Sequence, residues 1–490
     1  MRYSAGMSDK GRRIWLLALL GLLSGCASRG AGGLTLNERA EHVITVDPDG
    51  VPVDPTTYAE LSTADVERQL DAVTAAIDRS GKKKVLLFVH GGLNNREAAQ
   101  RHVDALLDPM TADGYYPIFL NWNSDLVDTA REDLLYIRQG RTARILGPLS
   151  APLAVLIAVG NGLIRAPLVW GQMLSSDINA SGVYDFPGKA NSAAVQAGLF
   201  RLQQEHDAGR IPLEIGEDGV GPWDSAGAAL RYAVTLPIKL VLSPIIDGLG
   251  QAAWRNMLRR TQMLFHREDE FDIRDRRDPG AVREHLLRGP QGAAHRLFSY
   301  LESHLRTRSG VELTLIGHSM GTIVLNRALR QFPELPVRHI VYLAAACSID
   351  DFQTSVIPYL ERHGGESDFY ILTLHPSAEV REWQKTLLDL TPRGSLLVWI
   401  DNFLGDPTTT LDRTLGSWEN LMQTAHVIPM SVRPRVTLKA FGIGGPPRPG
   451  APTTPTTHGG FTEKATRFWC PQVWTVAGGD PPAPCAATVP

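Results

Sequence analysis

The order of apolar and polar stretches along the chain predicts strands that alternate with helices. Residues 84–89 form an unbroken apolar run flanked by polar sequence, as expected of a parallel strand buried on both faces. Apolar residues at helical spacing follow over 96–107. Further strand-length apolar runs occupy 116–120, 312–316, 339–343, 368–374 and 435–440. This alternation predicts an α/β fold, with a mostly parallel sheet wrapped by helices.

The alternation stops between Asn123 and about Pro290, and a connection of that length must contain structure of its own. Two parts of it are strongly apolar. Residues 145–164 carry no charge, and residues 233–254 carry only two charged side chains. Glycines and prolines in the first part argue against a membrane span. We expect a large, mainly helical cap over 124–290, whose apolar helices line an acyl pocket or rest on lipid; mutual packing of these helices is the alternative.

The N-terminus has the pattern of an export signal. Basic residues precede the uncharged run Ile14–Leu23, which is too short for a comfortable membrane span. The run ends in Leu-Ser-Gly-Cys26, which resembles the lipobox of bacterial lipoproteins; an ordinary secretory signal is the alternative. The resemblance implies that residues 1–25 are removed, that Cys26 is acylated, and that 26–40 form a tether. With alanine rather than aspartate after Cys26, it implies the periplasmic face of the outer membrane.

Charge and cysteine content limit which partners and covalent links the chain is expected to have. The 490 residues include 49 Lys+Arg and 52 Asp+Glu, so a formal charge of −3 gives no electrostatic reason to bind nucleic acid. In an oxidising compartment Cys470 and Cys485 are candidates for a disulfide that closes a short C-terminal loop. Cys347 follows an apolar run and is interpreted as a small buried apolar residue.

The sequence Gly317-His-Ser319-Met320-Gly321 joins a predicted strand to a predicted helix. Small residues two before and two after a serine let the chain turn sharply and present its hydroxyl at the end of the strand. In this context the sequence resembles the α/β-hydrolase superfamily, specifically its lipases and esterases. The resemblance implies that Ser319 is a nucleophile. It also implies that the backbone amide of Met320 helps to hold a developing oxyanion.

A second motif, His90-Gly91-Gly92, follows the first predicted strand and resembles the oxyanion loop of the same superfamily. Glycines there allow backbone amides to point into the site. The resemblance therefore implies that the oxyanion is held by an amide at or just after Gly91, Gly92 or Leu93, together with that of Met320.

The superfamily orders its triad as serine, acid, histidine, so the base must follow Ser319. His458 lies beyond the last predicted strand and is the expected base; the alternatives, which are less well placed, are His339, His363, His375 and His426. The acid should follow the strand 368–374, whose continuation reads His-Pro-Ser-Ala-Glu379-Val-Arg-Glu. Glu379 is the chosen acid, with Asp401 and Asp406 as rivals.

Together these motifs predict a membrane-anchored serine hydrolase that cleaves carboxylic esters, with acyl lipids as the expected substrate class and no cofactor or metal. The expected partners are this substrate and the membrane, reached through Cys26 and the apolar cap. An acyltransferase with the same nucleophile and a non-catalytic lipoprotein that binds lipid or a partner are the alternatives. The hydrolase core is expected in two parts, 41–123 and 291–490, on either side of the cap.

Overall fold

A computed structural model describes residues 36–92, 94–138, 141–143, 145–182, 213–214, 226–266, 292–374, 378–379, 382, 390–424, 427–441, 454–476 and 485. The predicted signal peptide, the predicted acylation site Cys26 and the loop residue Leu93 lie outside these ranges. Helix α2 (Leu36–His42) begins within the range of the predicted tether, 26–40, so the last part of that range is helical rather than a flexible tether.

The centre of the fold is a nine-stranded sheet in the order β2-β1-β4-β3-β8-β9-β10-β11-β7. All neighbouring strands run parallel except β1 and β2. The mostly parallel α/β architecture expected from the sequence is therefore present. The strands are β1 (Val43–Val46), β2 (Pro52–Val53), β3 (Lys84–Val89), β4 (Tyr115–Trp122), β7 (Leu213–Glu214), β8 (Glu312–His318), β9 (Val337–Leu343), β10 (Asp368–Leu374) and β11 (Val436–Phe441).

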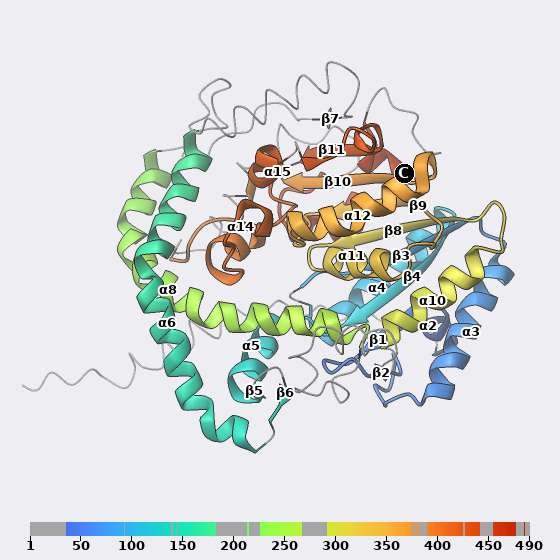
Figure 1. Cartoon of the computed structure of the whole chain (residues 1–490), viewed down its shortest axis with the longest axis horizontal. Helices are drawn as coiled ribbons and strands as arrows, with labels where there is room; N and C mark the ends of the chain where they lie inside the picture. The colour runs from blue at the N-terminus through green and yellow to red at the C-terminus, as the bar shows by residue number, and fades with distance from the viewer. Residues whose placement is uncertain are drawn as a thin grey trace, which may run out of the picture. The chain divides into compact units, whose positions relative to one another are not determined.

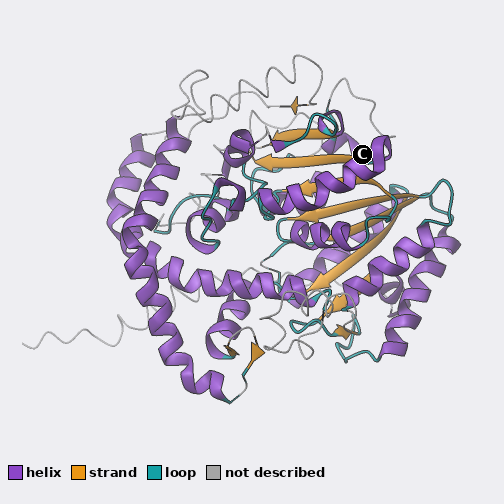
Figure 2. Cartoon of the chain, in the orientation of Figure 1, coloured by secondary structure: helices purple, strands orange, loops and turns teal. Residues whose placement is uncertain are grey.

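Helices flank the sheet (Figure 2). At the start of α3 the side chain of Ser62 accepts a hydrogen bond from the backbone N–H of Asp65, and the two residues form a capping box. The helices of this part are α3 (Thr63–Ser80), α4 (Arg96–Ala112), α10 (Ala293–Leu305), α11 (Gly321–Gln331), α12 (Ile349–His363), α14 (Leu396–Trp399), α15 (Trp418–Thr424) and α16 (Pro471–Trp474), with a π-helix, η4, at Ile400–Leu404.

The strand order reverses between β3 and β8. The next strand in the sequence, β4, pairs with one edge of β3, whereas β8 pairs with the other edge of β3. In open α/β sheets such a switch point leaves a crevice at the carboxyl ends of the two strands, where ligands bind. The register pairs Val89 with Gly317, so the residues that follow each strand lie side by side.

The segment between β4 and β8 contains α5 (Leu126–Leu135), a small hairpin (β5, Ile137–Arg138; β6, Arg141–Thr142) and two long helices, α6 (Leu146–Gly182) and α8 (Ala226–Met263). Figure 1 shows α6 and the first half of α8 side by side, with the second half of α8 running back toward the sheet. The described part of this segment is thus mainly helical. Its strand β7 also extends the main sheet beside β11, which the apolar pattern did not indicate.

Candidate functional site

Ser319 occupies a sharp turn between β8 and α11. Its φ is +50°, a left-handed conformation that is uncommon outside glycine and strained for most side chains. The turn is held by its own backbone, because the Ser319 amide donates to the Leu343 carbonyl at 2.9 Å and the Ser319 carbonyl accepts from the amides of Thr322 and Ala346, both at 3.1 Å. A strained backbone fixed by three hydrogen bonds presents the Ser319 side chain at the switch point.

The two flanking glycines are explained by what surrounds them. A Cβ on Gly321 would lie 2.1 Å from the carbonyl oxygen of Val89, so only glycine lets α11 begin this close to β3. A Cβ on Gly317 would lie 2.9 Å from the side chain of Leu325. The spacing of the motif therefore reflects backbone packing on both sides of Ser319.

The loop after β3 packs directly against the serine. A Cβ on Gly91 would lie 2.7 Å from both the Cβ of Ser319 and the Nδ1 of His318. One on Gly92 would lie 3.2 Å from the sulfur of Met320. The two glycine motifs, which lie far apart in the sequence, are thus in contact.

His90 orients this loop. Its Nδ1 lies 2.8 Å from the Gly91 carbonyl oxygen, and its Nε2 accepts from the backbone N–H of Trp122 at 3.2 Å. An imidazole that donates at one nitrogen and accepts at the other is neutral, and burial lowers the pKa of His90 to about 4. The hydroxyl of Ser124 donates to the same Gly91 carbonyl at 2.9 Å. The Gly91 carbonyl is therefore held on the side of β4.

This arrangement sets the direction of the next amide. The C=O and N–H of a trans peptide point in opposite directions, so the N–H of Gly92 is turned away from Ser124 and His90. On the other side of the turn, no side chain caps the N-terminus of α11, where Met320 is the N-cap residue. In the described turns and loops, the backbone N–H groups of Gly92 and Met320 donate to no backbone carbonyl.

His458 lies beside the serine turn. Its carbonyl oxygen is 3.0 Å from the Nε2 of His318, and the two imidazole rings are 5.0 Å apart between centroids. Neither ring nitrogen of His458 has a hydrogen-bond partner among the described residues, and the same is true of the Ser319 hydroxyl. Burial lowers the pKa of His458 to about 4, so its ring is a neutral base near pH 7. The expected nucleophile and base are thus neighbours of one residue, His318.

The other histidines considered as bases are placed elsewhere or lie outside the described residues. His339 is on β9 against Trp474, and His363 contacts the Pro333 carbonyl at the end of α12. His375 and His426 are not among the described residues.

The structure brings Glu382, rather than Glu379, to His458. A carboxylate oxygen of Glu382 accepts from the backbone N–H of His458 at 2.9 Å. Burial raises the pKa of Glu382 to about 7, and the hydrogen bond from His458 opposes that rise. Glu382 stands in the segment in which the acid was expected, three residues beyond Glu379. No signal in the sequence separated these two glutamates.

The three acids proposed from the sequence have other surroundings. Glu379 is buried, one of its carboxylate oxygens has no hydrogen-bond partner among the described residues, and burial followed by the nearby charge of Asp401 raises its pKa well above the ordinary value. Asp401 accepts hydrogen bonds from Thr414 at 2.9 and 3.0 Å and from Asn420 at 2.6 Å. Asp406 forms an ion pair with Arg165 at 2.7 Å. Asp401 and Asp406 are therefore committed to structural contacts.

The loop that carries His458 is fastened to α4. Nε2 of His102 lies 2.8 Å from the carbonyl oxygen of Thr462, four residues after His458. Farther along, the indole N–H of Trp469 donates to Asp113 at 2.7 Å. The disulfide expected between Cys470 and Cys485 is formed, and Cys347 is buried with a free thiol.

The site is covered. Ser319 is fully buried and His458 is 5% exposed. Part of the cover comes from α8, because a Cβ on Gly92 would lie 2.7 Å from the terminal methyl of Met257. The second half of the long helix α8 thus reaches the His90-Gly91-Gly92 loop.

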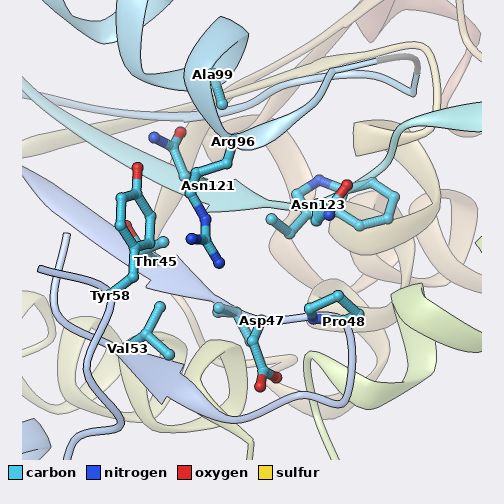
Figure 3. A pocket seen from close by; sticks show the side chains of 11 residues that line it. Thr45, Asp47, Pro48, Val53, Tyr58, Arg96, Ala99, Asn121 and Asn123 are labelled. Carbon is cyan, nitrogen blue, oxygen red and sulfur yellow. The ribbon is translucent and has the colours of Figure 1, made fainter. Parts of the chain in front are cut away.

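Two cavities lie away from Ser319. The one in Figure 3 is at the carboxyl ends of β1 and β4, where the Arg96 guanidinium stacks 3.8 Å over the Tyr58 ring; its volume of about 20 Å³ admits about one water. A larger one, about 520 Å³, separates α6 from α15 and includes Arg413 and Glu419. Neither is lined by Ser319 or His458.

Among the described residues, the one group of side chains close enough to share a metal ion is Asp113 with Cys470 and Cys485. These cysteines are joined in the disulfide, which leaves no thiolate to bind a metal.

Comparisons with protein-family models, with curated proteins and with solved structures found no match for this chain.

Proposed function

We propose that this protein is a serine hydrolase of the α/β-hydrolase fold that cleaves carboxylic esters of acyl lipids. The observation that carries the proposal is the position of Ser319. It sits on a left-handed turn at the strand-order switch. The His90-Gly91-Gly92 loop lies against its Cβ, and His458 lies against the preceding residue, His318. Two buried groups with unsatisfied polar atoms are costly to fold, and such groups are found at catalytic sites.

The proposed reaction uses each of these groups. The Ser319 oxygen attacks the ester carbonyl carbon while His458 takes the hydroxyl proton. The amides of Gly92 and Met320 stabilise the oxyanion of the tetrahedral intermediate. His458 then returns the proton to the departing alcohol, leaving an acyl group on Ser319. A water molecule attacks the acyl carbon and loses a proton to His458. His458 passes this proton to the Ser319 oxygen as the bond between that oxygen and the acyl carbon breaks, and the fatty acid leaves.

Glu382 is proposed as the carboxylate that positions His458. Its present contact is with the backbone N–H of His458, so it holds the residue rather than the ring. A carboxylate beside the base also stabilises the imidazolium that forms during the reaction. This assignment replaces Glu379, for which the structure offers no contact with the base.

Labelling with a fluorophosphonate probe tests the nucleophile. Wild type and Ser431→Ala, which removes an exposed hydroxyl that contacts Glu361, should both react. Ser319→Ala should not react. Equal reaction of wild type and Ser319→Ala, or reaction of neither, would remove the enzymatic proposal. An ester series of increasing acyl length then defines the substrate, and faster transfer to an added alcohol than to water would instead identify an acyltransferase.

The cell-envelope location is proposed on the lipobox-like sequence ending in Cys26. Metabolic labelling with a palmitate analogue should mark the native protein in a Gram-negative host and leave Cys26→Ser unmarked. Unmarked native protein would contradict acylation without bearing on Ser319.

A further inference from the structure

Exposed apolar side chains gather on the two long helices. Eleven of the large exposed apolar residues lie between Ile145 and Trp170, and four lie between Leu230 and Val241; among the described residues only Leu411 and Met430 are found elsewhere. Ile164 is 80% exposed and Leu149 is 77% exposed. Scattered exposed apolar residues are ordinary, but a contiguous patch of this kind marks a binding surface. We call the exposed apolar side chains of 145–170 and 230–241 the apolar face.

The charges of these helices are directed away from the apolar face. Arg165 pairs with the fully buried Asp247 at 3.1 Å and with Asp406 at 2.7 Å. Lys239 is also fully buried, 4.5 Å over the ring of Tyr232. Among the described residues of 145–170 and 230–241, the one exposed charge is Arg231, near the N-terminus of α8. A surface with a single exposed charge at its edge favours contact with hydrocarbon.

The width of the apolar face favours a lipid surface over a helical partner as its occupant. Ile145, Leu149, Leu153 and Ile157 follow one another at four-residue spacing, which makes a stripe along α6. Adjacent residues such as Leu163 and Ile164 are both exposed, so the stripe is wider than the narrow seam through which two helices pack. A broad, uncharged face on a helix matches the acyl region of a membrane.

Helices α6 and α8 pack closely against each other. A Cβ on Gly162 would lie 1.9 Å from the Pro244 carbonyl oxygen, and one on Gly248 would lie 2.1 Å from that of Ala158. Small residues at such a crossing let two backbones approach closely, as in helix pairs within membranes. Near the crossing, the Trp170 indole donates to the Leu240 carbonyl at 2.7 Å. The apolar side chains of both helices therefore form one surface.

We infer that the apolar face of α6 and α8 inserts into the hydrocarbon of a phospholipid bilayer. Both helices are long and apolar enough to cross a membrane by length and composition. However, the second half of α8 packs on α5 and η4, with Ala253 and Met257 buried, so this half is not available to lipid. If only the apolar face enters one leaflet of the bilayer, both the apolar character of the helices and the burial of the second half of α8 are explained. The contact would orient the molecule so that α8 leads from the bilayer to Gly92 of the oxyanion loop.

A fluorescent reporter of depth tests this contact. Leu156→Cys and Val234→Cys, each labelled with an environment-sensitive fluorophore, place the reporter on the apolar face of the full chain. Met430→Cys is the matched control, since it is an exposed apolar residue elsewhere on the surface. Among the described residues the introduced thiol is the exposed one, because Cys470 and Cys485 form a disulfide and Cys347 is buried. All three variants also carry Ser319→Ala, so that hydrolysis plays no part in the result.

The expected result with vesicles of phosphatidylethanolamine and phosphatidylglycerol is a blue shift at 156 and 234, quenched by brominated acyl chains, and no shift at 430. Water-like emission at all three positions would overturn the inference. A blue shift before vesicles are added that grows with protein concentration would also overturn it, and would identify a second copy of the chain as the occupant. Because catalysis is removed throughout, failure here leaves the proposed hydrolase untouched.

Discussion

Gly91 packs so closely against Ser319 that a Cβ added to Gly91 would lie 2.7 Å from the Cβ of Ser319. Two segments more than two hundred residues apart in sequence meet at this contact because β3 and β8 are parallel neighbours whose register pairs Val89 with Gly317. The contact leaves no room for a side chain between the proposed oxyanion loop and the proposed nucleophile.

Gly91→Ala should therefore displace the loop from Ser319. We expect kcat to fall by about 10²–10³-fold, the usual cost of losing one oxyanion donor. Steady-state hydrolysis of a short-chain ester measures the effect. The control is Gly365→Ala, where an added Cβ has nothing within 4 Å. Equal activity of Gly91→Ala and the control would show that this loop does not serve the reaction.

His90 should act on catalysis through the Gly91 carbonyl. His90→Ala removes the contact at Gly91 and leaves the buried N–H of Trp122 without its acceptor, which costs about 1–3 kcal/mol of unfolding free energy. We expect kcat to fall by up to about 10²-fold, with KM little changed, because only the oxyanion donor is misplaced. His90→Gln, which can donate and accept at the same two places, should recover part of kcat. If His90→Gln recovers stability but none of the activity, the positioning role is wrong.

The identity of the acid can be settled by comparing neutral substitutions. Glu382→Gln should lower kcat by up to about 10⁴-fold, as expected when a triad carboxylate loses its charge. Glu379→Gln, Asp401→Asn and Asp406→Asn should retain far more activity. A loss confined to Glu379→Gln would restore the assignment made from the sequence.

Glu382 should also leave a signature in the dependence of stability on pH. Its pKa is about 7 in the fold and near 4.5 when exposed, so between these values the folded protein holds a proton that the unfolded chain has released. The contribution of Glu382 to the free energy of unfolding therefore falls as pH rises through this window. Glu382→Gln removes this loss, so the stability of the variant relative to wild type should increase from pH 4.5 to pH 8. Urea unfolding of both proteins at several pH values measures it, and a constant difference would contradict the raised pKa.

The buried histidines shift stability in the opposite direction. His90 and His458 have pKa values of about 4 in the fold, so they lower stability as pH falls below 6.5, where the unfolded chain becomes protonated. Wild type and Glu382→Gln share these histidines. The difference between the two proteins therefore isolates the carboxylate.

The residue pattern by itself determined the alternation of strands and helices and the two glycine motifs. A parallel strand buried on both faces is an almost continuous apolar run, and a tight turn needs small residues, so both leave local signals. The pattern also located Ser319 and, by its order after the last strand, His458. It showed that 145–164 and 233–254 are apolar, because composition does not depend on the fold.

Only the tertiary structure decided which carboxylate meets the base and which side of α6 is exposed. Glu382 and His458 are 76 residues apart, and Glu379 is equally acidic and lies in the same segment. The helical pattern of α6 is apolar nearly all round, so the exposed side depends on where α8 crosses it at Gly162. Contacts between distant segments are set by packing and strand register, which no short stretch of sequence encodes.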